Sequence, residues 1–157
     1  MNEADLDAVD RKILSAIQKD SRRPIAELAA LAGASTASVQ RRLRRLRENG
    51  VILCEAAQLD PVRLGFGITA VVSVDLERDR LDQIDAFKRK ARADPNVQHF
   101  YCVAGEADFI IVVVARDMAD YEQFTHRFFF ADKNVRKFRT SIAVAREKST
   151  LALPLEA

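Results

Sequence analysis

Tryptophan is absent from this chain of 157 residues, and cysteine and proline are scarce, with two and four residues. The two cysteines, Cys54 and Cys102, lie far apart and form no CxxC pair. A disulfide framework or a cysteine zinc site is therefore not expected, and we expect two reduced, buried thiols. Long apolar runs are also missing, since the longest, Phe109 to Ala115, is far too short to span a membrane.

Signals for export and for metal chemistry are missing as well. The first ten residues, MNEADLDAVD, are acidic and lack the apolar segment of a signal peptide, so we expect a cytoplasmic protein without a membrane partner. His99 and His126 have no second ligand at metal spacing, and no metal site is expected. Glu106 and Asp108 form a carboxylate pair without an evident nucleophile, which argues against an enzyme.

Charge is distributed unevenly along the chain. The net charge is only +2, and 48% hydrophobic residues suffice for one or two small domains. Between Ser21 and Gly50, however, seven basic residues face two acidic ones, a local charge of +5. The basic character belongs to one element, as expected of a nucleic-acid-binding module attached to another domain.

That element is the segment PIAELAALAGASTASVQRRLRRLRENG, residues 24–50. It predicts two short helices joined by a tight turn. Gly33 suits the end of the first helix, where a left-handed residue is common, and Ser35 is a suitable N-cap for the second. Val39, Leu43 and Leu46 recur at spacings of four and three, which places them on one buried face of the second helix.

The remaining positions of the second helix predict a DNA-reading face. At about 100° per residue, Arg41, Arg44 and Arg45 point away from the core, and Arg42 and Arg47 lie at its flanks. Small residues at the helix start allow close approach to bases, and arginines reach phosphates or guanine. A merely solvated basic face is the alternative. The expected DNA-binding residues are Ser35, Thr36, Ser38, Gln40, Arg41, Arg42, Arg44 and Arg45.

A third helix precedes this pair. Residues 7–19 carry an apolar stripe, and Asp5 or Asp7 can cap the helix start. The expected core of the trihelical domain consists of Ile13, Leu14, Ile17, Leu28, Leu31, Val39, Leu43 and Leu46. Residues 51–59 look extended and complete a winged helix-turn-helix domain over residues 1–60, ahead of the break at Asp60-Pro61.

The pattern changes after residue 60. Alternating apolar residues predict strands over residues 68–76, 97–104, 109–116 and 135–146. Helical periodicity lies between them, with Leu81, Ile84, Phe87 and Ala91 on one stripe. Met118, Tyr121, Phe124, Thr125 and Phe128 form the other. The order βαββαβ predicts a ferredoxin-like antiparallel sheet over residues 61–157, and the chain is of the α+β class. Thr69, Val71 and Ser73 make a half-apolar sheet face suited to pairing.

Four stretches in this order resemble the Lrp/AsnC, or feast/famine, family of transcriptional regulators. They are LDAVDRKILSAIQKDSR, GASTASVQRRLRRLRENGVI, AAQLDPVRLGF and VAGEADFIIVV. The resemblance covers nearly the whole chain. It implies a RAM- or ACT-like ligand domain that forms homodimers and larger assemblies, a tetramer or octamer. It also implies binding of double-stranded DNA, no cofactor, and a small-molecule effector that is commonly an amino acid.

The effector site is expected at the hairpin between the second and third strands. Gly105 exposes backbone N–H groups for a carboxylate, and Glu106 and Asp108 accept hydrogen bonds from an ammonium group. Ala107 is smaller than the residue usual in the family, which makes room for a larger ligand side chain. The expected effector-binding residues are Tyr101, Gly105, Glu106, Ala107, Asp108, Thr140 and Ser141. A polar turn that binds nothing is the alternative.

Three functions remain open at this point. The first is a sequence-specific transcriptional regulator of local scope that responds to an effector. The second is an architectural protein that wraps DNA broadly. The third is an enzyme or the metabolite-sensing subunit of one, which the arginine-rich helix disfavours.

Overall fold

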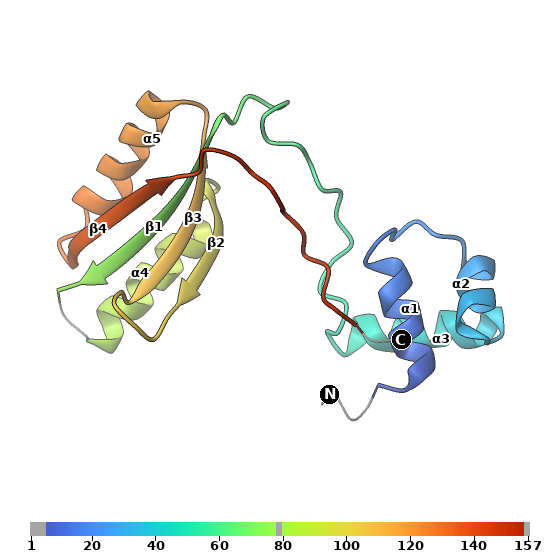
Figure 1. Ribbon diagram of the computed structural model, residues 1–157. Coiled ribbons are helices and arrows are strands. Elements are labelled where there is room, and N and C mark those ends of the chain that lie inside the picture. The colour runs from blue at the N-terminus through green and yellow to red at the C-terminus, as the bar shows by residue number, and fades with distance from the viewer. Residues whose placement is uncertain (1–5, 78–79, 156–157) are drawn as a thin grey trace. The chain divides into compact units, whose positions relative to one another are not determined.

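The computed structural model of the chain describes residues 6–77 and 80–155 (Figure 1). The chain forms two compact units. One comprises Met1–Gln58 together with Lys148–Ala157, and the other comprises Leu59–Glu147. Each unit has its own hydrophobic core.

The first unit contains three helices. Asp7 is the N-cap of the first one, because its carboxylate accepts a hydrogen bond from the Asp10 N–H at 2.8 Å. The Asp10 carboxylate accepts in return from the Asp7 N–H, which completes a capping box. Asp5, the other expected cap, lies outside the described residues. The helices are α1 (Ala8–Ile17), α2 (Ile25–Ala32) and α3 (Thr36–Glu48).

The turn between α2 and α3 has the predicted chemistry. Gly33 ends α2 with φ at 66°, a left-handed conformation that other residues rarely adopt. Ser35 has extended backbone geometry, and its hydroxyl accepts the Ser38 N–H at 3.2 Å. This bond satisfies one of the backbone donors left unpaired at the start of α3. The helix-turn-helix prediction is therefore confirmed.

The core of the first unit is small. Most predicted core residues are buried, with Val39, Leu43 and Leu46 inward on α3 as expected. Leu31 is an exception because 53% of its surface is exposed, so its assignment to the core is wrong. The neighbouring Ala29 and Ala32 are the residues of α2 that join Leu28 in this core.

The segment after α3 differs from the prediction. No strand lies between α3 and Ile68 in the described residues, so the expected wing strand over residues 51–59 does not form. Ile52 packs against the helical core, but Leu53 is 90% exposed. A lone extended segment leaves its backbone groups unpaired, and no neighbouring strand is available here among the described residues.

Cys54 and Cys102 are both exposed free thiols, which corrects the expectation of buried ones.

The C-terminal segment belongs to the helical unit. The Gln18 side-chain amide donates to the Leu153 carbonyl oxygen and accepts from the Leu153 N–H, both at 2.9 Å. Gln58 Nε2 also donates to the Ser149 carbonyl oxygen at 3.0 Å. The side chains of Gln18 and Gln58 thus satisfy backbone groups of the C-terminal segment, which has no strand partner among the described residues.

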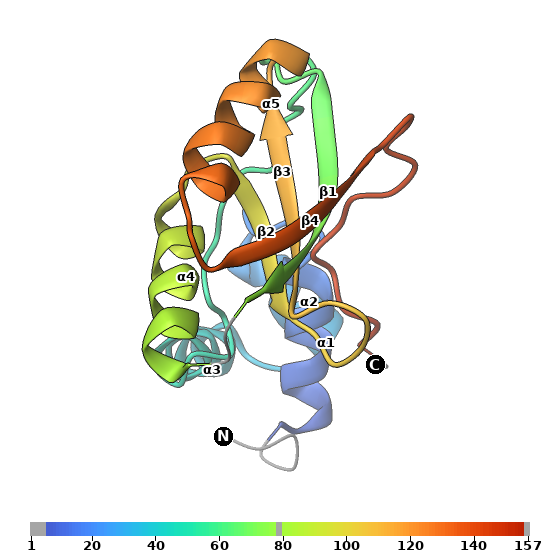
Figure 2. The ribbon, with the colours of Figure 1, turned by 90° about the vertical axis from the view of Figure 1, so that its left-hand side faces the viewer.

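The second unit is a four-stranded antiparallel sheet with the strand order β2-β3-β1-β4. Figures 1 and 2 show helices α4 and α5 on one face of this sheet. The order βαββαβ confirms the predicted topology. The elements are β1 (Ile68–Leu76), α4 (Leu81–Ala93), β2 (Val97–Cys102), β3 (Phe109–Ala115), α5 (Met118–Thr125), the π-helix η2 (His126–Phe130) and β4 (Val135–Ile142).

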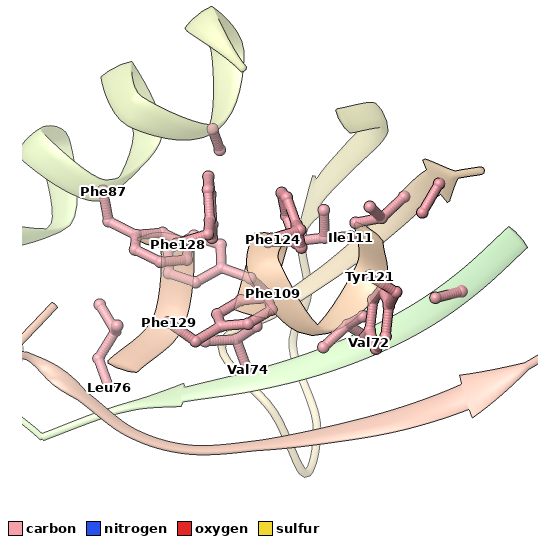
Figure 3. Packing of buried hydrophobic residues seen from close by; sticks show 14 residues of the cluster. Val72, Val74, Leu76, Phe87, Phe109, Ile111, Tyr121, Phe124, Phe128 and Phe129 are labelled. Atoms are coloured by element: carbon pink, nitrogen blue, oxygen red, sulfur yellow. The ribbon is translucent and has the colours of Figure 1, made fainter. Parts of the chain in front are cut away.

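Phenylalanine dominates the core between helices and sheet (Figure 3). Phe87 of α4 stacks on Phe109 of β3, with ring centroids 5.1 Å apart. Phe124 stacks on Phe128 at 4.9 Å, so the π-helical turn keeps the predicted apolar face of α5 directed inward. Leu81 and Met118, the first residues of their helices, are 79% and 55% exposed and lie outside the core. Val144 lies beyond the end of β4 and is fully exposed.

On the opposite face of the sheet, the described residues of this unit form no helix (Figure 2). Successive residues of a strand alternate between faces, so Val72 points to the helices and Val71 points away. Val71 is 40% exposed and lies opposite Val112 of β3. We call this surface the open face. Its residues are Thr69, Val71, Ser73, Asp75, His99, Tyr101, Ile110, Val112, Val114, Lys137, Arg139 and Ser141.

Candidate nucleic-acid interface and effector site

The exposed surface of α3 is a stripe that begins with small and polar residues and becomes basic. Ala37, Gln40, Arg41 and Arg44 are all exposed and recur at spacings of three and four, which places them on one side of the helix. The opposite side is fixed by burial of Val39, Leu43 and Leu46. The buried side therefore determines which side chains the helix presents to a partner.

Three of the five arginines on α3 are engaged by acids of the same unit. Arg42 Nη1 lies 2.7 Å from Asp7 Oδ2 and 2.8 Å from Asp10 Oδ1. Arg45 Nη2 lies 2.5 Å from Asp10 Oδ2. The third, Arg47, donates to Glu55 Oε1 at 2.8 Å.

Arg41 and Arg44 are the exception on this helix. Neither forms an ion pair with any residue in the ranges 6–77 and 80–155. Their guanidinium groups are therefore available to an external anion. Arg45 differs from them because its guanidinium donates to Asp10, although 43% of its side chain is exposed, and its role in DNA binding stays a prediction.

Asp10 is the residue that the sequence analysis missed. Its side chain is 1% exposed, and each of its carboxylate oxygens accepts from a different arginine. A carboxylate taken out of water is costly unless it is paired and hydrogen-bonded, and removing one partner of such a pair costs about 3–5 kcal/mol. The signal was the spacing of Asp7 and Asp10, because an acid three residues into a helix is a capping-box residue.

The charges in this cluster shift one another's protonation. The backbone N–H of Asp10 and the Arg42 guanidinium hold the pKa of Asp7 below its ordinary value of 3.8. Hydrogen bonds to Asp10 and Asp7 raise the pKa of Arg42. Both effects favour the charged forms of Asp7 and Arg42.

The serines and threonine at the start of α3 have different environments. The Ser35 hydroxyl caps the helix by accepting a hydrogen bond from the Ser38 N–H, and Ser38 itself is half-buried. Thr36 and Gln40 are exposed. Thr36 and Gln40 therefore have more freedom to meet a base edge than Ser35 has.

The expected effector hairpin connects β2 and β3 and is largely exposed. Gly105 and Glu106 are exposed, and Ala107 is half-buried. Asp108 has a structural role, because its Oδ2 accepts from the Leu76 N–H at 2.7 Å. Its own N–H donates to the Val74 carbonyl oxygen at 3.1 Å, so Asp108 fastens the hairpin to the end of β1.

The other expected effector residues are not all on one side of the sheet. Thr140 lies opposite Val72, and its hydroxyl is 2.6 Å from the hydroxyl of Tyr121 on the helix side. Ser141 lies opposite Val71, on the open face. The prediction that both hydroxyls serve one site is wrong, because neighbouring residues of a strand point in opposite directions.

Tyr101 lies on the open face of β2. It is 53% exposed and stacks against His99, with ring centroids 6.1 Å apart. Burial raises the pKa of Tyr121 in the core, in contrast. The structure thus places Tyr101 and Ser141 on one sheet face, with Thr140 on the other.

Residues 6–77 and 80–155 contain no group of three or more histidine, cysteine, aspartate or glutamate side chains able to hold a metal ion. Within the same residues, no helix is long and apolar enough to cross a membrane.

A three-helix DNA-binding unit and a βαββαβ unit define a helix-turn-helix regulator with an attached ligand domain. The chain matches the family model of the AsnC-type helix-turn-helix domain over residues 6–47. It matches the model of the Lrp/AsnC ligand binding domain over residues 69–153. The chain belongs to the Lrp/AsnC family of transcriptional regulators.

Individual relatives support this assignment over nearly the full length. An uncharacterized HTH-type transcriptional regulator of Sinorhizobium fredii is 42% identical over 152 residues, covering 97% of this chain and 90% of the relative. An AsnC family transcriptional regulator from Agrobacterium tumefaciens has a similar crystal structure, with a TM-score of 0.89, 34% identity and coverage of 96% and 97%.

A second solved structure carries a ligand. It is a transcriptional regulator of Neisseria meningitidis in complex with L-Met, with a TM-score of 0.88, 28% identity and coverage of 96% and 97%. The relatives are named as regulators of transcription. The chain is thus a DNA-binding regulator and not an enzyme, as the sequence analysis expected.

The ion cluster predicts a specific acid sensitivity. Because the pKa of Asp7 is lowered by folding, its contribution to stability is present above pH 3.8 and is lost as the pH falls through the folded value. We expect Asp7→Asn to melt at a lower temperature than wild type at pH 7. The difference in melting temperature between Asp7→Asn and wild type should decrease as the pH is lowered from about 5 to about 3. Thermal melts across this range check it, with Glu27→Gln, an exposed acid on α2, as the control. A gap for Asp7→Asn that is independent of pH would contradict the assignment.

Proposed function

We propose that the protein is a sequence-specific transcriptional regulator that reads DNA with the exposed stripe of α3. The observation that carries this proposal is the pair Arg41 and Arg44, which have no acid partner among the residues that the structure describes and lie next to Gln40 on the same side of the helix. Arginine recognises guanine through two acceptors, and glutamine recognises adenine through a donor and an acceptor. Ala37 leaves space for the helix start to approach the major groove.

Self-association is the second part of the proposal. The open face has an apolar centre of Val71, Ile110 and Val112, with charged and polar residues toward its edges. A sheet face of this composition is stabilised when a second copy covers it, and a two-fold dimer uses the same surface on both subunits. We propose a homodimer through the open face, with assembly to a tetramer or octamer, and DNA sites that are inverted repeats.

The third part is an amino-acid effector at the hairpin. The Neisseria meningitidis relative is in complex with L-Met, which supports an amino acid as the class of ligand. Glu106 is exposed and free to accept from an ammonium group, and Gly105 leaves the backbone accessible to a carboxylate. Asp108 contributes its charge while its Oδ2 also holds Leu76.

The number of genomic targets separates a local regulator from an architectural protein. Both bind DNA with the same helix, so the structure favours neither. A genome-wide occupancy map distinguishes them, because a local regulator occupies few sites and an architectural protein occupies many.

For DNA binding, we expect Arg41→Ala and Arg44→Ala each to weaken binding by about 1–3 kcal/mol while the melting temperature stays near that of wild type. The probe is a duplex enriched from a random pool by the wild-type protein. If the lost partner is a phosphate, each variant should also reduce the slope of log K against log salt by about 0.9, the value expected for one phosphate contact. Arg92→Ala on α4 removes the same charge as a control. Wild-type affinity in both α3 variants would refute the reading stripe.

For assembly, we expect Val71→Asp to convert the oligomer into monomers at micromolar concentration, because a charge on the apolar centre must be desolvated when a second copy covers it. Light scattering of the full chain measures this. Leu31→Asp places the same charge on an exposed leucine of the helical unit and should leave assembly unchanged. An oligomer that withstands Val71→Asp would place the subunit contact elsewhere.

For the effector, a thermal-shift screen of the common amino acids, L-methionine included, first identifies a stabilising one. Asp108→Asn keeps an acceptor for the Leu76 N–H but loses the charge that binds an ammonium group. We expect this variant to bind DNA like wild type without the amino acid and to lose the response to it. Glu122→Gln on α5 is the charge-matched control. A normal response in Asp108→Asn would show that the ligand binds elsewhere.

A further inference from the structure

The starting point is the position of the buried Asp10 carboxylate between two arginines of the recognition helix. Asp10 Oδ1 accepts from Arg42 at 2.8 Å, and Oδ2 accepts from Arg45 at 2.5 Å. Asp7 adds a second bond to Arg42 at 2.7 Å. Two acids of α1 therefore neutralise two arginines of α3.

These contacts fix the arginines more firmly than a surface ion pair does. The Asp10 side chain is 1% exposed, and the Nε atoms of Arg42 and Arg45 are also shielded from solvent. Moving either guanidinium to a phosphate would leave a buried carboxylate short of a partner, which is strongly unfavourable. The Asp10 carboxylate thus holds the two guanidinium groups in place.

The consequence concerns the balance between phosphate and base contacts. Each cation that neutralises a phosphate adds affinity for any DNA sequence, and base contacts alone discriminate between sequences. The α3 helix has five arginines in the printed sequence, but Asp10 and Asp7 pair with two of them, Arg42 and Arg45, whose side chains are 21% and 43% exposed.

We propose that Asp10 is a specificity-determining positioning residue that withholds Arg42 and Arg45 from the DNA backbone. It keeps the number of phosphate contacts low, so that the base contacts of the exposed stripe decide where the protein binds. This inference rests on the DNA-reading role proposed above. A purely structural role for Asp10 makes a different prediction, because loss of stability alone does not add phosphate contacts.

The test is the salt dependence of binding to a random-sequence duplex, measured with the full chain. Asp10→Asn should steepen the slope of log K against log salt by about 1–2, since each added phosphate contact contributes about 0.9. Its preference for the selected duplex over the random one should fall. Glu27→Gln changes the net charge equally from an exposed position on α2 and should leave the slope unchanged. A folded Asp10→Asn variant with the wild-type slope would overturn the proposal.

A second pair of variants identifies the arginine involved. Arg45→Ala in the Asp10→Asn background should remove about one unit of the added slope, close to the 0.9 expected per phosphate contact. In the wild-type background the same substitution should change the slope by much less. Equal effects of Arg45→Ala in the two backgrounds would show that Asp10 does not withhold Arg45, and would overturn the proposal.

The proposal stays testable if Asp10→Asn fails to fold. Arg41→Gln and Arg45→Gln remove the same charge one helical turn apart on the otherwise intact chain. Arg41→Gln should weaken binding to the selected duplex at least about tenfold more than Arg45→Gln does. Equal losses would overturn the inference. A wild-type protein that binds no DNA would instead overturn the proposed function, so the two failures are distinguishable.

Discussion

The buried ion pair between Asp10 of α1 and the arginines of α3 is the contact on which the DNA-binding unit depends. The apolar core of this unit is small, and it fixes only one side of α3. The Asp10 carboxylate adds a polar contact between α1 and α3, because its two oxygens accept from Arg42 and Arg45. With Arg42 and Arg45 paired to these acids, Arg41 and Arg44 are the exposed arginines left to contact a partner. The capping box joins the same cluster to the start of α1, so helix capping, helix packing and surface charge depend on one side chain.

In the second unit, the main constraint is the sheet, which has one face covered by helices and one face exposed. Its helices cover one face of the sheet with phenylalanine and leave the other face open. An open face with Val71 and Val112 at its centre remains partly in contact with water in a single chain, which is unfavourable for apolar surface. Burial against a second copy removes this cost, and the exposed Arg139 lies 3.5 Å from the buried Asp75 carboxylate at the edge of this face.

Sequence patterns predicted the elements but not the contacts between them. The spacing of Val39, Leu43 and Leu46 and the alternation along β1 arise within single elements, so periodicity was enough to find them. The partner of Arg45 is 35 residues away and depends on how two helices pack, which no local pattern encodes. Thr140 and Ser141 are a different case, because the alternation of side chains along a strand already predicts that neighbouring residues lie on opposite faces of the sheet. The prediction of a wing strand over residues 51–59 was wrong because a sequence that favours an extended backbone does not by itself provide a partner strand.

Strand β1 connects the proposed ligand site with the proposed subunit contact. Its end is held by Asp108 of the hairpin through the Leu76 N–H, and its middle supplies Val71 to the open face. An ammonium group that binds the Asp108 carboxylate competes with the Leu76 N–H for the same charge. A ligand at the hairpin therefore has a direct way to change the geometry of β1. By thermodynamic linkage, a ligand that favours one assembly must bind that assembly more tightly than the other. The free energy by which the ligand stabilises the assembly therefore equals the free energy by which the assembly strengthens ligand binding.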